Sequence, residues 1–262
     1  MAWFCGIDVG SVGTKAVLTK DGEISFYHVI MSGANYTASA KKVMGEVLAI
    51  AGLSVDDVSF IAATGYGAAR TEFANEQFSD ISCCARGVHR VFPNVRTVVD
   101  IGGQASKVIR INSEGKSTNF VISERCAAGS GRFLQVIARV LQIDLQDAGP
   151  LSLKSNNPVT YTTGCAVFGE SEAVSRVAEG RPKEDILAGV QNAIAAKVTA
   201  LVDRVRLEEE CAMVGGGALD IGLVKRTEEK LGVTLRVPEH PRLMAALGAA
   251  LYGRERVDTS SG

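Results

Sequence analysis

The sequence predicts an α/β protein built from two related halves, and three observations support this expectation. First, an apolar strand carries an Asp, a Gly two residues later and a Lys seven residues after the Asp, once from Cys5 and again from Val99. Second, each copy continues into a hairpin with a glycine in its turn. Third, helical periodicity follows each hairpin. A duplicated strand-rich start followed by helices is typical of a two-part α/β fold.

Each expected element follows from a local pattern. Residues 16–26 surround an Asp-Gly turn and residues 108–120 surround a Glu-Gly turn, so both segments are expected to form β-hairpins. Apolar residues that recur about every 3.6 positions predict helices, and an apolar run before three glycines predicts a strand. The expected helices cover residues 37–51, 132–141, 182–205 and 241–252, and the expected strand covers residues 211–214.

Composition limits the class of protein. The 262 residues carry 28 Lys plus Arg against 29 Asp plus Glu, and 46% are hydrophobic, which suffices for one large or two small domains. We expect the two halves at residues 1–94 and 95–262. The near-zero net charge disfavours non-specific binding to nucleic acid or anionic membranes. Without an evident signal peptide or a long apolar run, the expected location is the cytoplasm, with no membrane or nucleic-acid partner.

Both repeated strands end in a loop that is suited to phosphate. Glycine lets phosphate approach the backbone, exposed N–H groups bind its oxygens, and a carboxylate holds a hydrated magnesium ion. Two ordinary glycine-containing hairpins are the alternative, but they would not explain why Asp and Lys recur at one offset. The candidate residues are Asp8, Gly10, Ser11, Gly13, Thr14 and Lys15 in the first loop, and Asp100, Gly102, Gly103 and Gln104 in the second.

A third glycine loop follows the strand at residues 211–214. It consists of Gly215, Gly216, Gly217 and Ala218 and leaves room for the flat face of a nucleoside. The P-loop string and the dinucleotide-binding glycine pattern are both missing from the expected places. With the duplicated loops, this pattern resembles the actin, Hsp70 and hexokinase superfamily of ATPases. The resemblance implies duplicated actin-like (RNase H-like) halves with ATP in a central cleft, and catalytic roles for Asp8, Asp100 and Gln104.

Two of the six cysteines stand apart from the rest. Cys126 and Cys165 each lie beside glycine and just before an expected helix, where unpaired N–H groups and the helix dipole favour a thiolate. Cys5 and Cys211 lie in expected strands and have the pattern of core thiols. Two ligands are too few for a four-thiolate site, but a symmetric dimer would supply four. A [4Fe-4S] cluster and a zinc ion both fit that count.

Longer motifs give a more specific resemblance. Asp-Val-Gly-Ser-Val-Gly-Thr-Lys (8–15), Ala-Thr-Gly-Tyr-Gly (63–67), Asp-Ile-Gly-Gly-Gln (100–104), Cys-Ala-Ala-Gly-Ser-Gly-Arg-Phe-Leu (126–134) and Cys-Ala-Val-Phe-Gly-Glu-Ser-Glu (165–172) look like the activator ATPases of 2-hydroxyacyl-CoA dehydratases. The ATP-binding subunits of benzoyl-CoA reductases share these motifs. The resemblance covers nearly the whole chain.

This resemblance implies an ATP-driven electron carrier. It assigns Cys126 and Cys165 to a [4Fe-4S] cluster shared between two subunits, the two Asp-Gly loops to phosphate and Mg²⁺, and the Gly215 loop to the adenosine of ATP or ADP. The partner is an iron–sulfur acyl-CoA dehydratase or reductase component, and ferredoxin or flavodoxin supplies the electron. The dimer is either a homodimer or a heterodimer with a related ATPase subunit.

Two positions depart from the family pattern. Ala105 replaces an Asp after Gly-Gly-Gln, and Asp220 stands where the family commonly has Asn. Losing a carboxylate beside the phosphates is easier to accept in one subunit of a heterodimer, which favours the reductase type slightly. Two other functions stay open on the sequence alone: a hexokinase-type kinase, with Asp100 or another carboxylate as its base, and an ATP-gated scaffold without hydrolysis.

Overall fold

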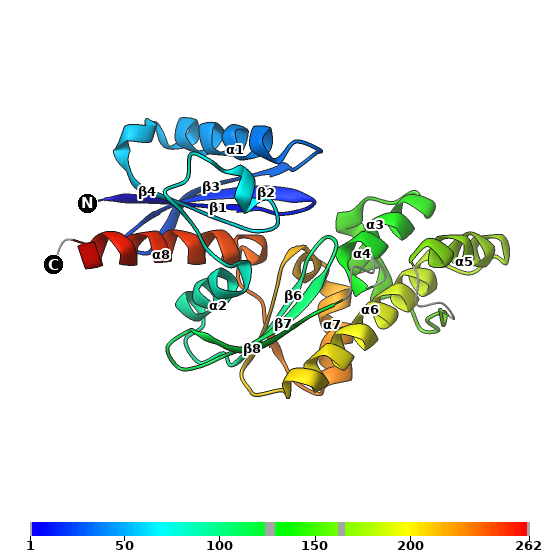
Figure 1. The fold of residues 1–262 in the computed structure, drawn as a ribbon. Coiled ribbons are helices and arrows are strands. Elements are labelled where there is room, and N and C mark those ends of the chain that lie inside the picture. Colours follow the sequence, from blue (N-terminus) through cyan, green and yellow to red (C-terminus); the bar gives the residue numbers. More distant parts are fainter. Residues whose placement is uncertain (1, 124–128, 162–165, 261–262) are drawn as a thin grey trace. The chain divides into compact units, whose positions relative to one another are not determined.

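The computed structural model describes residues 2–123, 129–161 and 166–260, which form two compact units (Figure 1). Unit 1 comprises Met1–Val95, Ile111–Thr118 and Arg242–Gly262, and unit 2 comprises Arg96–Arg110 and Asn119–Pro241. The contacts therefore group the C-terminal segment with unit 1, whereas the halves expected from the sequence placed it with the second.

Unit 1 contains a five-stranded mixed sheet. Its strands are β1 (Trp3–Val9), β2 (Gly13–Lys20), β3 (Glu23–Met31), β4 (Val58–Thr64) and β5 (Glu76–Gln77), in the order β3-β2-β1-β4-β5. The first three strands are antiparallel neighbours, and β4 and β5 continue the sheet in parallel with β1. The β2–β3 turn has positive φ at Asp21 and Gly22, as an Asp-Gly hairpin turn requires.

Unit 2 repeats this arrangement. Its strands are β6 (Thr97–Ile101), β7 (Ser106–Ile111), β8 (Ser117–Ile122), β9 (Cys211–Val214) and β10 (Leu235–Arg236), in the order β10-β9-β6-β7-β8. The β6–β7 pair is antiparallel, whereas β6–β9 and β9–β10 are parallel, as are the corresponding strands of unit 1. The predicted α/β duplication is confirmed.

Two helices cover the sheet of unit 1, with α1 (Tyr36–Ala51) on one face and α8 (Met244–Ser260) on the other (Figure 1). Helix α2 (Asp80–Val91) packs against α8. Glycines bring these backbones together, because a Cβ at Gly6 of β1 would lie 1.9 Å from the Ala246 carbonyl oxygen. A Cβ at Gly248 of α8 would lie 1.8 Å from the carbonyl oxygen of Cys83 in α2. No other residue fits at either position.

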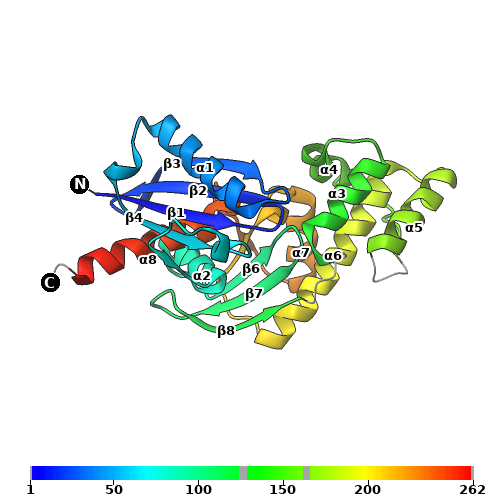
Figure 2. The same cartoon turned by 45° about the horizontal axis from the view of Figure 1, so that its top comes forward.

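The helices of unit 2 surround the long helix α6 (Lys183–Val205), which packs against the other four (Figure 2). These are α3 (Gly131–Val140), α4 (Leu145–Ser152), α5 (Ala166–Ala178) and α7 (Ile221–Leu231). Among the described segments, α6 alone is long and apolar enough to span a membrane, but 67% of its apolar window is buried within the protein. Its fully buried Ile186, Ile194 and Val198 make it a core helix.

Candidate active site

An Asp–Lys ion pair of the same kind lies at the start of each predicted phosphate loop. In unit 1, Asp8 of β1 is the direct cross-strand partner of Lys15 in β2, and the Lys15 Nζ lies 2.8 Å from an Asp8 carboxylate oxygen. In unit 2, Asp100 of β6 is the cross-strand partner of Lys107 in β7, at 3.4 Å. The recurring offset of seven residues is therefore the register of a short hairpin. Each pair fixes a nearly buried carboxylate at the start of its loop.

An equivalent backbone hydrogen bond closes each loop and leaves no room for a side chain on the donor residue. The Gly10 N–H donates to the Gly13 carbonyl (3.2 Å), and the Gly102 N–H donates to the Ala105 carbonyl (3.0 Å). A Cβ at Gly10 would lie 2.7 Å from the Gly13 oxygen, and one at Gly102 would lie 2.8 Å from the Ala105 oxygen. Glycine is needed at both positions, which leaves the bare backbone of each loop open to a ligand.

The other predicted loop residues have different environments. Gln104 is exposed, whereas Ser11, Gly13 and Gly103 are partly exposed. Thr14 is fully buried, and its hydroxyl bonds the Ser32 hydroxyl at 2.8 Å. Ser32 in turn donates to the Gly10 carbonyl (2.6 Å). Thr14 thus supports the first loop from within, and a direct contact with phosphate stays a prediction.

A glycine from the neighbouring parallel strand packs against each Asp. After β4, Gly65 has φ +90°, and a Cβ there would lie 2.3 Å from Asp8 Oδ1. After β9, Gly215 has φ +81°, and a Cβ there would also lie 2.3 Å from Asp100 Oδ1. In the sequence, Gly65 stands out only as part of the Ala-Thr-Gly-Tyr-Gly motif at residues 63–67. The recurrence of Gly-x-Gly after both strands was the signal that could have identified it.

The two Gly-x-Gly loops differ at their central residue. Tyr66 fills the centre in unit 1, where the residue is 64% exposed and its ring lies edge-on to that of Tyr36, with centroids 5.9 Å apart. Gly216 is the centre in unit 2, and an added Cβ there would meet no atom within 4 Å. Only the unit 2 loop offers an open face without a side chain, which favours the predicted adenosine role of the Gly215 loop over its counterpart in unit 1.

The second phosphate loop is bonded to the start of α3. The Gly131 N–H donates to the Gly102 carbonyl (2.9 Å), and the Arg132 N–H donates to the Gly103 carbonyl (3.2 Å). The Ser130 hydroxyl adds a bond to the same Gly103 oxygen (3.1 Å). These bonds satisfy N–H groups that have no partner within a helix. They also join the loop to the helix that follows the Cys126 segment.

The predicted cluster ligands Cys126 and Cys165 lie outside the described residues. Burial raises the pKa of Cys5 and Cys83 to about 12 and that of Cys211 to about 11, so these thiols keep their protons near neutral pH. Within the described ranges, no three or more His, Cys, Asp or Glu side chains are grouped to hold a metal ion. The assignment of Cys126 and Cys165 as ligands stays a prediction.

Asp220, one of the two departures from the family pattern, caps α7 from inside unit 2. Its carboxylate accepts from the Leu223 N–H (2.8 Å) and from Gln191 Nε2 (2.9 and 3.1 Å). Gln191 is fully buried, and its Oε1 has no hydrogen-bond partner in the described structure. Burial raises the pKa of Asp220 above its ordinary value. The Asp220 N–H also donates to the Gly217 carbonyl (3.2 Å), so this residue joins the Gly215 loop to the start of α7.

We expect Asp220→Asn to stabilise the protein at neutral pH by about 1 kcal/mol, because the amide oxygen can keep the bonds from Leu223 and Gln191 without burying a charge. With its pKa raised on folding, Asp220 contributes stability at low pH that is lost as the pH rises through the folded pKa. Urea unfolding between about pH 4 and pH 8 should show this decline in the wild type and less of it in the variant. Asp203→Asn on the exposed face of α6 is the control, and equal pH profiles for all three proteins would contradict the assignment.

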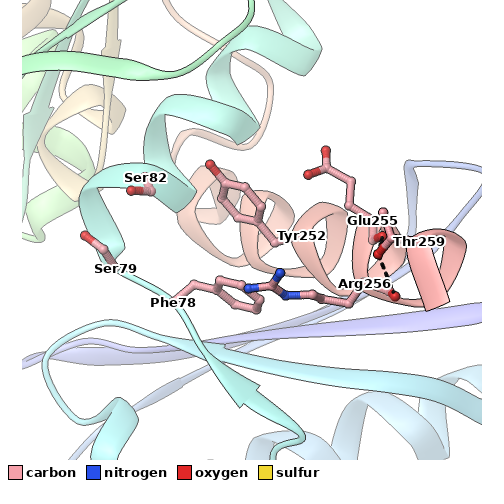
Figure 3. Close-up of a pocket in the computed structure, with 7 residues that line it drawn as sticks. All are labelled: Phe78, Ser79, Ser82, Tyr252, Glu255, Arg256 and Thr259. Atoms are coloured by element: carbon pink, nitrogen blue, oxygen red, sulfur yellow. Dashed lines mark hydrogen bonds between the residues drawn. The ribbon is translucent and has the colours of Figure 1, made fainter.

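A pocket of about 410 Å³ lies elsewhere in unit 1, between the start of α2 and the end of α8 (Figure 3). The Phe78 and Tyr252 rings stack in it at 5.1 Å. Its charged groups are already paired, since Arg256 binds Glu76 through two nitrogens at 2.8 and 2.7 Å and Glu255 binds Arg86. None of the predicted site residues lines this pocket.

Solved structures of other proteins resemble the fold of this chain. A ROK family glucokinase from Streptomyces griseus has a TM-score of 0.63 at 11% identity, covering 97% of this chain and all of that one, which shows the fold alone. The dehydratase activator structure from Clostridium difficile with bound ADPNP is 37% identical, with a TM-score of 0.95 over 99% of this chain and 97% of that chain. The architecture is therefore that of the actin and hexokinase-like ATPases.

Proteins of similar sequence identify the family within this superfamily. The (R)-2-hydroxyglutaryl-CoA dehydratase activating ATPase of Acidaminococcus fermentans is 39% identical over 96% of both chains. A benzoyl-CoA reductase subunit of Thauera aromatica is 32% identical over 96% of this chain and 93% of the relative. The BadF/BadG/BcrA/BcrD ATPase family model matches residues 5–253. The chain therefore belongs to the BadF/BadG/BcrA/BcrD ATPase family.

Proposed function

We propose that this protein is an ATP-driven electron-transfer subunit of an acyl-CoA dehydratase or benzoyl-CoA reductase system in the cytoplasm. It accepts an electron from ferredoxin or flavodoxin and delivers it at low potential to an iron–sulfur partner enzyme. The observation that carries the proposal is the bonding of Gly102 and Gly103 to the start of α3. These bonds connect a phosphate loop directly to the helix that follows Cys126.

The nucleotide is held by the duplicated loops. Asp8 and Asp100 would hold the hydration shell of Mg²⁺, which neutralises phosphate charge, and their lysine partners fix the orientation of both carboxylates. The open face at Gly216 accommodates the adenosine. The duplicated Asp–Lys geometry supports this assignment, because a core hairpin has no need of a buried ion pair at its end.

The cluster is held by Cys126 and Cys165 from each of two subunits, either identical or related. Burial raises the pKa of three of the four remaining cysteines, which favours Cys126 and Cys165 as the donors of a four-thiolate group. A bound [4Fe-4S] cluster supplies reversible one-electron transfer. The protein contributes the two segments, the helices that follow them and the link to the second phosphate loop.

ATP acts on electron transfer through the start of α3. A ligand changes a conformation only if it binds two states with different affinity. Phosphate at Gly102 and Gly103 changes the loop whose carbonyl groups receive the first N–H groups of α3, and the position of α3 changes with it. Nucleotide state and cluster environment are thereby coupled within unit 2.

Anaerobic purification followed by iron and sulfide analysis tests this function. We expect brown protein with one cluster per dimer, and we expect Cys126→Ser or Cys165→Ser to lose all bound iron, because the cluster has no spare thiolate. Cys5→Ser and Cys211→Ser are matched controls that should keep it. A colourless dimer that contains zinc, or a colourless monomer that phosphorylates a sugar, would overturn the proposal. Native mass determination distinguishes a homodimer from a heterodimer.

A further inference from the structure

The carbonyl groups of the first phosphate loop are bonded to donors within unit 1, and one residue binds two of them. The Ser32 N–H donates to the Val12 carbonyl (3.0 Å), and the Ser32 hydroxyl donates to the Gly10 carbonyl (2.6 Å). The Gly13 carbonyl accepts from the Gly10 N–H. Ser32 directly follows β3 and is only 3% exposed. Three carbonyl oxygens of the loop are therefore turned toward donors of the protein.

The direction of these carbonyl groups decides how the loop interacts with an anion. Backbone N–H groups attract phosphate oxygens, whereas a carbonyl oxygen that faces the same site repels them. The Ser32 hydroxyl keeps the Gly10 oxygen turned toward itself and so fixes the orientation of this peptide group. In unit 2, the corresponding Gly102 carbonyl accepts from the Gly131 N–H of α3. Both loops thus have the same carbonyl bonded, but by different donors.

A second buried hydroxyl group fixes the orientation of Ser32. The single hydroxyl hydrogen of Ser32 is used toward Gly10, so Thr14 is the donor in the 2.8 Å bond between the Thr14 and Ser32 hydroxyls. The Thr14 hydroxyl also lies 3.3 Å from that of Ser39 in α1, and Ser39 donates to the Tyr36 carbonyl (3.0 Å). Thr14 is fully buried. These hydroxyl groups form one chain from the start of α1 to the Gly10 carbonyl.

We propose that Ser32 and Thr14 are positioning residues for the phosphate of bound ATP. Ser32 acts through the Gly10 peptide group, and Thr14 acts through Ser32, without either side chain touching the nucleotide. This inference rests on the proposed function, in which the Asp8 loop binds phosphate and Mg²⁺. It gives Thr14 a role different from the direct phosphate contact that the sequence predicts.

The first test is Ser32→Ala, which removes the bond to Gly10 and keeps the N–H bond to Val12. The Gly10 carbonyl loses its donor and is free to turn toward the phosphate. We therefore expect the Kd for magnesium-ATP, measured by calorimetry, to rise by roughly tenfold. Thermal unfolding of the same variant measures how much stability is lost along with the affinity.

The second test separates the hydroxyl group of Thr14 from its methyl group. Thr14→Val keeps the shape of the side chain but leaves the Ser32 hydroxyl without its donor, so the Kd for magnesium-ATP should rise by roughly threefold to tenfold. Thr14→Ser keeps the hydroxyl and removes a buried methyl group. Its thermal stability should fall, but its ATP affinity should stay near that of the wild type.

Thr19→Val is the matched control, because Thr19 lies in the same strand β2 and is only 1% exposed. Its hydroxyl donates to the Phe4 carbonyl (3.3 Å) and is not part of the chain that leads to Gly10. Thr19→Val should lose stability as Thr14→Val does and bind ATP as the wild type does.

The comparison of affinity with stability decides between a positioning role and a purely structural one. If ATP affinity follows the melting temperature in every variant, so that Thr14→Ser binds as weakly as Thr14→Val, the positioning role is overturned. Unchanged affinity in both Ser32→Ala and Thr14→Val overturns it as well. If Ser32→Ala does not fold, the two Thr14 variants still decide.

Failure of the proposed function gives a different result. Wild-type protein that does not bind magnesium-ATP refutes the proposed nucleotide site, and the positioning role with it. Wild-type protein that binds ATP but contains no iron after anaerobic purification refutes the electron-transfer role alone. In that case, the Ser32 and Thr14 variants still test how the first loop is positioned for phosphate.

Discussion

Asp8→Asn should lower magnesium-dependent ATP hydrolysis by about a hundredfold or more while leaving the fold intact. The Asp8 carboxylate is 12% exposed, lies 2.8 Å from Lys15 and has Gly65 packed against it, so it is held in one orientation. An amide of the same size keeps this packing but removes the charge that holds the hydrated metal ion. Phosphate release and calorimetry with and without magnesium measure the loss.

The matched control is Asp56→Asn, which removes an exposed carboxylate from a short 3₁₀ turn at Val55–Asp57 in the same unit. It should hydrolyse ATP as the wild type does. Asp100→Asn should resemble Asp8→Asn, because Asp100 has the same lysine and glycine neighbours. Equal activity in all these proteins would show that the duplicated carboxylates are structural and not part of the nucleotide site.

Gly215→Ala should weaken ATP binding by at least about tenfold, which corresponds to about 1.4 kcal/mol. Its φ of +81° disfavours any residue with a Cβ, and the added carbon would lie 2.3 Å from Asp100 Oδ1 and 2.5 Å from the Ile101 carbonyl. Either the β9 loop or the Asp100 side chain must move, and the proposed nucleotide contacts move with it. Calorimetric titration with ATP, alongside thermal unfolding, separates lost binding from lost folding.

Gly216→Ala provides the neighbouring control for that experiment. A Cβ at Gly216 meets nothing within 4 Å, so the fold should tolerate it with unchanged thermal stability. If the adenosine lies on this loop, Gly216→Ala should reduce ATP affinity at unchanged thermal stability, because its methyl group enters the open face, whereas Gly215→Ala should reduce both. Wild-type affinity in Gly215→Ala would exclude the loop as part of the nucleotide site.

The sequence predicted the elements that depend on neighbouring residues. The helices at 37–51 and 132–141 agree with α1 and α3 to within a residue at each end, because their apolar stripes are regular. The Asp-Gly turn at residues 21–22 has the positive φ values expected of it. The duplication was also predictable from the sequence. An Asp and a Lys seven residues apart are cross-strand partners in both hairpins, so the spacing reflects the hairpin register.

Features that depend on distant contacts were not predictable in the same way. Nothing near Ser106 in the sequence shows that it bonds both Ser123 and Gly129, because that contact exists only after β7 and α3 come together. Helix α4 was missed because it contains Gly149 and Pro150, which ordinarily signal a turn. The roles of the predicted site residues, including Cys126 and Cys165, stay predictions until the variants above are measured.

Because α8 belongs to unit 1, the chain of unit 1 is completed last during synthesis. Ala246 and Gly248 of α8 pack against Gly6 of the sheet and Cys83 of α2. The ribosome adds both residues only after residues 96–241. At about 5–20 residues per second, this delay is on the order of ten seconds. Unit 2 therefore has its whole chain before unit 1 does. During that interval, the face of the unit 1 sheet that α8 buries has no partner from its own unit.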